Sequence, residues 1–235
     1  MLDLSKEYLS KFHSLIEGGK DRALIKKLES LHANDIALIL NQIKRDDVHY
    51  LYRLLADDSR SDVLAELDEE VREDLLSTLT SKEIAEDVID GLASDDAADI
   101  ISELSSEKIA EVFSHVKDQE SVSDVQSLLQ YPEGTAGALM AKELVQVEET
   151  WSVARAVKEI RVQSEDIENL YTIYVVDEKG KLTGRLSLQN LLLSSSSTRT
   201  PISDIKDSDE TVWINSNENE DLVVSLMERY DLVAL

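Results

Sequence analysis

The chain has 235 residues, 42% of them hydrophobic, and its 24 Lys and Arg against 49 Asp and Glu give a formal net charge of −25. This charge argues against binding to nucleic acid and against direct docking on an anionic membrane surface. The chain lacks cysteine, which excludes disulfides and thiolate zinc sites, and it shows no signal peptide and no apolar run near the ~20 residues of a membrane span. We therefore expect a soluble, intracellular chain with one large domain or two ordinary ones.

The first 130 residues predict an array of short helices. They contain no proline, and apolar residues recur at helical spacing, as in Leu24, Ile25, Leu28 and Leu31. A weak repeat places leucines 12 or 13 residues apart, at Leu55, Leu67, Leu79, Leu92 and Leu104. Polar turns follow several of these leucines, and we expect successive helix N-caps at Ser81, Ser94 and Ser106. The pattern is typical of an all-α superhelical, solenoid-like domain.

Acidic residues gather in the second half of this array. Between residues 57 and 100 there are 16 acidic residues and three basic ones. A helix that begins at Ser94 places Asp95 and Asp99 on one face. Two such carboxylates can hold a hard cation such as Mg²⁺. The competing interpretations are that these acids stabilise the first turn of a helix, or that they belong to a solvated surface.

Signs of catalysis are absent from the sequence. The four histidines are isolated, and the seven glycines form none of the known phosphate-binding loops. No pairing of a nucleophile with a base is visible. We therefore do not expect an enzyme.

The pattern changes at residues 131–140, Tyr-Pro-Glu-Gly-Thr-Ala-Gly-Ala-Leu-Met, where proline and two glycines mark a domain boundary. Strand and helix signals alternate after this boundary. We expect a compact β-α-β-β-α unit, with strands at 144–147, 171–176 and 182–188, a turn at 177–180, and helices at 152–162 and 189–193. A serine run at 194–198 then predicts a flexible link.

A second copy of this unit begins after the link. Residues 211–214 parallel the first strand, residues 219–230 parallel the first helix, and residues 231–235 parallel the opening of the next strand. The sequence stops there, which would leave an apolar strand edge unpaired. We therefore expect the chain to be a fragment of a longer protein.

Two stretches of sequence carry a resemblance to known families. Residues 175–187, Val-Val-Asp-Glu-Lys-Gly-Lys-Leu-Thr-Gly-Arg-Leu-Ser, resemble part of a CBS domain, and residues 131–140 resemble the junction of the MgtE family of magnesium transporters. The order of the parts is also similar. The resemblance implies an all-α superhelical N-terminal domain (1–130), the junction (131–140), an α/β CBS unit (141–198) and the incomplete start of a second CBS unit (199–235).

The resemblance also implies a function. The chain would be the cytosolic Mg²⁺-sensing regulatory region of a homodimeric transporter, and its CBS units would form the dimer. The parent would be a multi-pass membrane protein whose transmembrane domain is missing here, which places this chain at the cytoplasmic face of the cell membrane. Mg²⁺ that bridges the acidic N-domain and CBS surfaces would favour the closed pore.

The same resemblance selects candidate metal ligands. In the N-terminal domain the family positions fall on Asp62, Asp95 and Asp99, and Asp62 stands where the family is expected to have Glu. In the second CBS unit they fall on Asp221, Glu228 and Asp231. At Glu228 the family contact can be a backbone oxygen instead of the carboxylate.

Family CBS units also bind ATP, which gives a second candidate site. A CBS unit commonly carries Ser/Thr-x-x-Asp after its third strand, where this chain has Ser187 and Asn190. Asn190 departs from that pattern but can still form hydrogen bonds with ribose hydroxyls. Two alternative functions therefore remain: an adenine-nucleotide-sensing CBS module, and an acidic α-solenoid that docks a basic protein.

Overall fold

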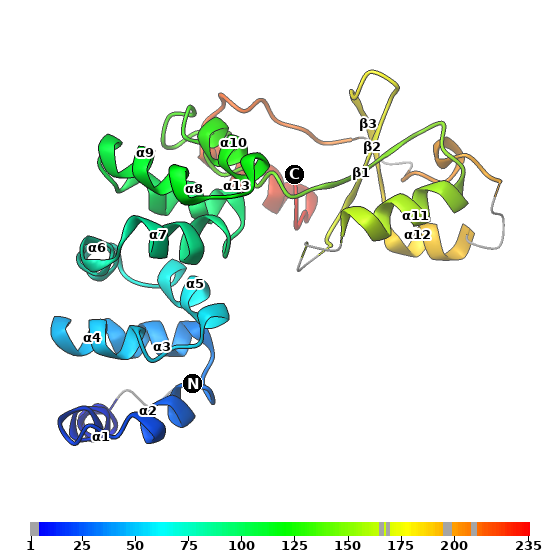
Figure 1. The fold of residues 1–235 in the computed structure, drawn as a ribbon. Coiled ribbons are helices and arrows are strands. Elements are labelled where there is room, and N and C mark those ends of the chain that lie inside the picture. The colour runs from blue at the N-terminus through cyan, green and yellow to red at the C-terminus, as the bar shows by residue number, and fades with distance from the viewer. Residues whose placement is uncertain (1–4, 165–166, 168–169, 195–198, 208–210) are drawn as a thin grey trace. The chain divides into compact units, whose positions relative to one another are not determined.

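The fold was analysed in a computed structural model that describes residues 5–164, 167, 170–194, 199–207 and 211–235. The chain divides into two compact units, residues 1–130 and residues 131–235. The first unit is helical, and the second contains a small sheet with helices (Figure 1).

The first unit is a succession of short helices that stack in chain order (Figure 1). A π-helical segment, in which the amide of Asp90 donates to the carbonyl of Ala85 at 3.0 Å, joins α7 to the turn before α8. The elements are α1 (Lys6–Glu17), α2 (Asp21–Leu28), α3 (Ala33–Leu40), α4 (Arg45–Tyr52), α5 (Asp57–Ala65), α6 (Glu69–Thr78), α7 (Ser81–Ile84), the π-helix (Ala85–Ile89), α8 (Ser94–Ser102), α9 (Ser106–His115) and α10 (Gln119–Leu128).

Several of these helices pack on the helix two places later in the chain. The contacting pairs include α3 with α5, α4 with α6, α7 with α9, and α8 with α10. A continuous apolar core follows the stack, with Leu24, Ile39, Leu51, Leu64, Leu75, Ile84 and Ile101 almost fully buried. This arrangement confirms the predicted all-α superhelical domain, in which every helix buries one face on its neighbours.

The prediction of N-caps at Ser81, Ser94 and Ser106 is wrong by one residue, because each of these serines is the first residue of its helix. The cap of α7 is Thr80, whose hydroxyl accepts a hydrogen bond from the Glu83 amide at 3.2 Å. The Glu83 carboxylate accepts from the Thr80 amide at 2.8 Å, which completes a capping box. Thr80 and Ser81 are adjacent hydroxyl residues at this turn, and Thr80, whose backbone is extended, caps the helix.

The second unit contains one three-stranded sheet. Its elements are β1 (Val145–Glu148), α11 (Val153–Gln163), β2 (Ile173–Val176), β3 (Leu182–Leu186), α12 (Leu188–Ser194), a 3₁₀ turn (Ile202–Asp204) and α13 (Glu220–Tyr230). The strand order is β1-β2-β3, with β1 parallel to β2 and β2 antiparallel to β3. The buried core joins Val147 and Val175 of the sheet to Ala156 of α11 and Leu191 of α12. The predicted β-α-β-β-α order is therefore present.

Two predicted strands do not form. Residues 211–214 and 231–235 are not strands, and Asp231 instead ends α13 in a left-handed conformation, with φ 51° and ψ 49°. A strand exists only through ladder hydrogen bonds to a neighbour, and the described residues provide none to these two segments. Most of the predicted serine link, at 195–198, lies outside the described residues.

The junction is hydrogen-bonded to the residues that lead into α13. The amides of Ala136 and Gly137 donate to the carbonyls of Glu218 and Ser216 at 2.8 and 2.7 Å, and the amide of Glu220 donates to the carbonyl of Gly134 at 3.0 Å. Three backbone bonds thus join segments that are about eighty residues apart in the sequence.

Within the described residues, no helix combines the length and the apolar character that crossing a membrane requires.

Candidate functional site

Helix α8 carries the predicted pair Asp95 and Asp99. It begins at Ser94, which is buried, after an extended Ala93 that provides no side-chain cap. Asp99 is exposed, whereas Asp95 is half-buried, and its Oδ1 atom is enclosed without a hydrogen-bond partner among the described residues. One helical turn, about 6 Å along the axis, separates the two positions, so both carboxylates lie on the same side of α8.

Negative charge is crowded around the start of this helix. Asp96 is exposed, but neighbouring groups exclude part of the water around its carboxyl. This desolvation raises the pKa of Asp96. The charges of Asp95, Asp99 and Glu66 raise the pKa of Asp96 further, whereas Arg72 lowers it. We call Glu66, Asp95, Asp96 and Asp99 the α8 acidic cluster. Like charges in such a cluster repel one another, and a bound cation would relieve that repulsion.

Asp62 is exposed on α5, near the turn that leads into α8. The preceding residue, Ser61, packs so closely on Gly91 that a β-carbon at Gly91 would lie 2.0 Å from the Ser61 hydroxyl oxygen. This close approach places the Asp62 segment beside the loop that precedes α8. Asp62 and the α8 acids therefore belong to one region of the helical unit.

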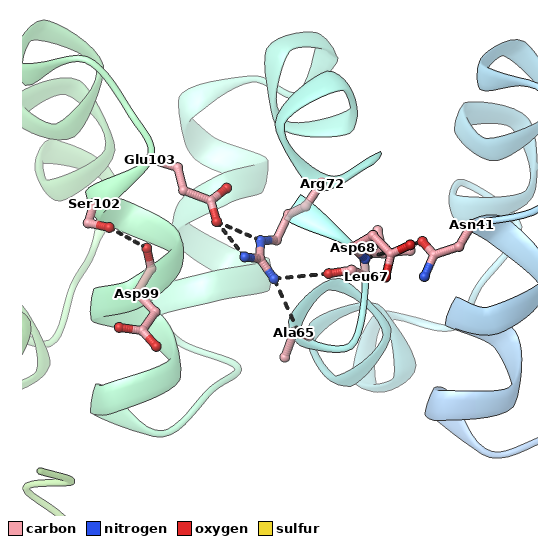
Figure 2. A network of polar contacts seen from close by, with 8 residues as sticks. All are labelled: Asn41, Ala65, Leu67, Asp68, Arg72, Asp99, Ser102 and Glu103. Carbon is pink, nitrogen blue, oxygen red and sulfur yellow. Dashed lines mark hydrogen bonds and ion pairs between the residues drawn. The ribbon is translucent and has the colours of Figure 1, made fainter. Parts of the chain in front are cut away.

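A buried ion pair joins α6 to the end of α8 beside the acidic cluster (Figure 2). Arg72 Nε donates to Glu103 Oε1 at 2.9 Å, and Nη2 contacts the same oxygen. The third nitrogen, Nη1, donates to the carbonyls of Ala65 and Leu67 at 3.3 and 3.2 Å. The side chains of Arg72 and Glu103 are only 16% and 12% exposed, so bulk water screens this pair weakly.

The candidate ligands of the second unit lie along α13. Asp221, Glu228 and Asp231 are all exposed, and the backbone amide of Asp221 donates to the Asn219 side chain at 2.8 Å. Asp221 and Glu228 are seven residues apart, which corresponds to roughly 10 Å along a helix axis. One ion with direct contacts of about 2.1 Å cannot touch both carboxylates from a single position.

No group of three or more Asp, Glu or His side chains within the described part of the chain has the geometry of a ready-made metal site. The carboxylates that the sequence selects are therefore brought into two acidic regions, one in each unit, and not into a closed coordination shell.

The nucleotide candidates are close together at the start of α12. The Ser187 hydroxyl accepts a hydrogen bond from the Asn190 amide at 3.2 Å, and Asn190 Nδ2 donates to Asp207 Oδ1 at 2.8 Å. Asp207 was not selected from the sequence, since it lies seventeen residues from Asn190 and in no motif. This chain has Asn190 where the CBS pattern has Asp. The carboxylate of Asp207, from a later segment, lies beside that position.

Sequence reasoning also missed Arg72, Glu103, Glu66 and Asp96. Arg72 had one available signal: it is one of three basic residues in the most acidic stretch of the chain. Its partner Glu103 could not be identified, because any of several carboxylates was within reach of an arginine whose neighbours were unknown.

Two families match the chain at the level of sequence. The MgtE intracellular N domain matches residues 31–134, and the CBS domain matches residues 136–197. The two matched regions correspond to most of the helical unit and to the sheet-containing part of the second unit.

Curated relatives carry the same name in different bacteria. The magnesium transporter MgtE of Thermus thermophilus is 31% identical over 221 residues, which is 94% of this chain and 48% of that protein. The magnesium transporter MgtE of Bacillus subtilis is 30% identical over 224 residues, with the same shares. The chain spans about half the length of these relatives.

Solved structures agree with the fold. The cytosolic domain of the Mg²⁺ channel MgtE in complex with ATP is 29% identical, with a TM-score of 0.84 over 95% of this chain and 90% of that one. The soluble part of a magnesium transporter, 22% identical, has a TM-score of 0.78 over 97% of this chain and 88% of the other, and it supports the fold alone. Together with the family matches, these structures confirm a helical N-terminal domain followed by a CBS region.

Proposed function

Because this chain belongs to the MgtE family, we propose that it is the cytosolic Mg²⁺-sensing regulatory region of a magnesium transporter, and not an enzyme. It acts at the cytoplasmic face of the cell membrane, together with a transmembrane domain of the same protein and with a second copy that it contacts through its CBS units. Mg²⁺ that bridges the acidic surfaces of the N domain and the CBS region favours the closed pore. Two findings support this assignment: the curated relatives are magnesium transporters, and a similar solved structure is the cytosolic domain of a Mg²⁺ channel.

The observation that carries the proposal is the crowding of carboxylates at the start of α8. Desolvation raises the pKa of Asp96, and the negative charges of Asp95 and Asp99 raise it further. Bringing such a surface close to another acidic surface is unfavourable unless cations lie between the two. Mg²⁺ suits such a role because it binds carboxylate oxygens and keeps several of its waters.

We assign the ion contacts to two sets of residues, Asp62, Asp95 and Asp99 in the first unit and Asp221, Glu228 and Asp231 in the second. The spacing along α8 and α13 implies several ions, each held by one or two carboxylates and by water. Each ion shifts the equilibrium only by its differential affinity for the closed arrangement. A site that binds only this arrangement contributes about 2.7 kcal/mol at ~100 times its dissociation constant, so a few sites suffice.

Small-angle scattering tests this proposal directly. Adding millimolar MgCl₂ to the chain at fixed ionic strength should reduce its radius of gyration and protect it from limited proteolysis. The double variant Asp95→Asn/Asp99→Asn should lose most of this response. The matched control, Glu107→Gln/Glu111→Gln, removes two exposed charges at the same spacing on α9 and should respond like the wild type. Equal effects of NaCl and MgCl₂ on the wild type would contradict Mg²⁺ sensing.

Adenine-nucleotide binding is a second function that a specific observation favours. The relative with a TM-score of 0.84 is described as a complex with ATP, and this chain places Ser187, Asn190 and Asp207 together beside α12. We propose that the Asn190 side chain forms a hydrogen bond with a ribose hydroxyl in the nucleotide-bound state. Calorimetry with ATP should show binding that Asn190→Ala weakens about fivefold, the value of one hydrogen bond, and Ser225→Ala on α13 should leave binding unchanged.

A further inference from the structure

The Arg72–Glu103 pair has an uneven arrangement of charge. Both Arg72 Nε and Nη2 contact Glu103 Oε1, whereas Glu103 Oε2 is buried and has no hydrogen-bond partner among the described residues. Figure 2 shows Asp99 one turn before Glu103 on α8, with its carboxylate turned away from the guanidinium.

The remaining nitrogen of the guanidinium contacts the backbone on either side of one member of the acidic cluster. Nη1 donates to the carbonyls of Ala65 and Leu67, the residues on either side of Glu66 in the chain. A fixed positive charge is thus held at the edge of a region that would otherwise be wholly negative.

We propose that Arg72 is a built-in counter-ion of the α8 acidic cluster that weakens the binding of Mg²⁺ there, and that Glu103 holds Arg72 in place and offsets part of its charge. The inference rests on the proposed Mg²⁺-sensing function and deepens it. The pair would set the Mg²⁺ concentration at which the cluster becomes occupied, without either residue contacting the ion.

A purely structural role for the pair makes a different prediction. If Arg72 and Glu103 only fasten α6 to α8, then removing either residue perturbs α8 and shifts Mg²⁺ binding in the same direction. If they act through charge, the two removals must shift Mg²⁺ binding in opposite directions, because one deletes a positive charge and the other a negative one.

The experiment is a Mg²⁺ titration of the whole chain at fixed ionic strength, with calorimetry and protease protection as readouts. Arg72→Gln should lower the Mg²⁺ midpoint about fivefold, because it removes the repulsion between one fixed positive charge and a nearby divalent ion. Glu103→Gln should raise the midpoint by a similar factor. The double variant should lie between the two, and Arg72→Lys, which keeps the charge, should bind Mg²⁺ like the wild type.

The control is Lys108→Gln on α9. Lys108 is a cation of the same unit that also donates to a backbone carbonyl, that of Leu79 at 3.3 Å, but it is not among the charges that act on Asp96. Its removal reproduces the change in net charge and should leave the midpoint nearly unchanged. Circular dichroism establishes that each variant is folded. If Arg72→Gln does not fold, the direction of the Glu103→Gln shift decides the question.

Shifts of Arg72→Gln and Glu103→Gln in the same direction, or no larger than that of Lys108→Gln, would overturn the inference and leave the Mg²⁺-sensing function standing. A wild-type chain that does not respond to Mg²⁺ at all would overturn both. The two failures are therefore distinguishable.

Discussion

At the scale of single residues, Asp87 in the π-helix is an ionisable group in a buried position. It is 6% exposed, and its Oδ2 atom accepts a hydrogen bond from the hydroxyl of Tyr52, itself almost fully buried, at 2.8 Å. Burial raises the pKa of the Asp87 carboxyl, while the bond from Tyr52 and the charge of Arg60 lower it. The net effect is a raised pKa, so the ionised form of Asp87 destabilises the folded state.

This raised pKa predicts a specific pH dependence. A carboxyl whose folded pKa lies above its unfolded value contributes most stability below the unfolded pKa, and this contribution is lost as the pH rises through the folded pKa. Asp87→Asn is neutral at every pH, and its Oδ1 atom can still accept from Tyr52. Urea unfolding from about pH 4 to 8 should show that this variant gains stability relative to the wild type as the pH rises. A constant difference across the range would contradict the prediction.

Tyr52→Phe should have a larger effect than an equivalent change at the surface. The variant leaves the Asp87 carboxylate buried without its donor, which should cost about 1–3 kcal/mol in the free energy of unfolding. The matched control is Tyr50→Phe, which removes a similar hydroxyl–carboxylate bond, to Asp21, at an exposed position. Equal losses in chemical denaturation would show that burial does not determine the cost.

The site residues differ in how far sequence could predict them. The spacing of Asp95 and Asp99 follows from the period of the helix and is local, so their common face on α8 is confirmed. The Arg72–Glu103 and Asn190–Asp207 contacts join residues that are 31 and 17 positions apart, and they depend on how separate segments pack. The assignment of metal and nucleotide contacts to any of these residues stays a prediction.

At the scale of secondary-structure elements, the contact between α5 and the turn before α8 depends on Gly91. Gly91→Ala would place a β-carbon 2.0 Å from Ser61 Oγ and 2.8 Å from Ser61 Cβ. The crowding should destabilise the first unit by about 1–3 kcal/mol, measured by thermal or urea unfolding. Adding Ser61→Gly should recover part of this loss, although glycine in a helix itself costs up to about 1 kcal/mol. Strict additivity of the two changes would argue against a clash.

Elements were predictable where their own residues determine them. Apolar periodicity identified the helices of the first unit, since each needs only one buried face and short polar turns. The hairpin of β2 and β3 was also predictable, because Gly180 takes the positive φ of 76° that its turn requires. The strand predicted at 211–214 failed because a strand depends on a neighbour, and β-branched composition does not provide one.

At the scale of the whole molecule, the net charge of −25 should make the stability of the chain sensitive to salt. NaCl should raise the melting temperature through general screening. MgCl₂ at the same ionic strength should raise it further in the wild type, and this additional increase should disappear in Asp95→Asn/Asp99→Asn while the NaCl effect remains. Differential scanning fluorimetry separates the two contributions. If the double variant loses both in proportion, the effect of Mg²⁺ is general screening.

The order of domains was the most predictable property at this scale. A helical acidic unit, a Pro/Gly junction and a CBS unit were visible in the sequence, and the family they indicated is confirmed. The proposed regulatory behaviour was not derivable in the same way, because it depends on equilibria between states and not on the pattern of residues within one state.

The three backbone bonds between residues 134–137 and 216–220 have a mechanical consequence. They close a loop of about eighty residues that contains the entire β1-β2-β3 sheet, so tension applied through the junction reaches the start of α13 without passing through the sheet. In a single-molecule pulling experiment, the first rupture should release this closure as one event, with a contour-length gain that corresponds to the enclosed loop.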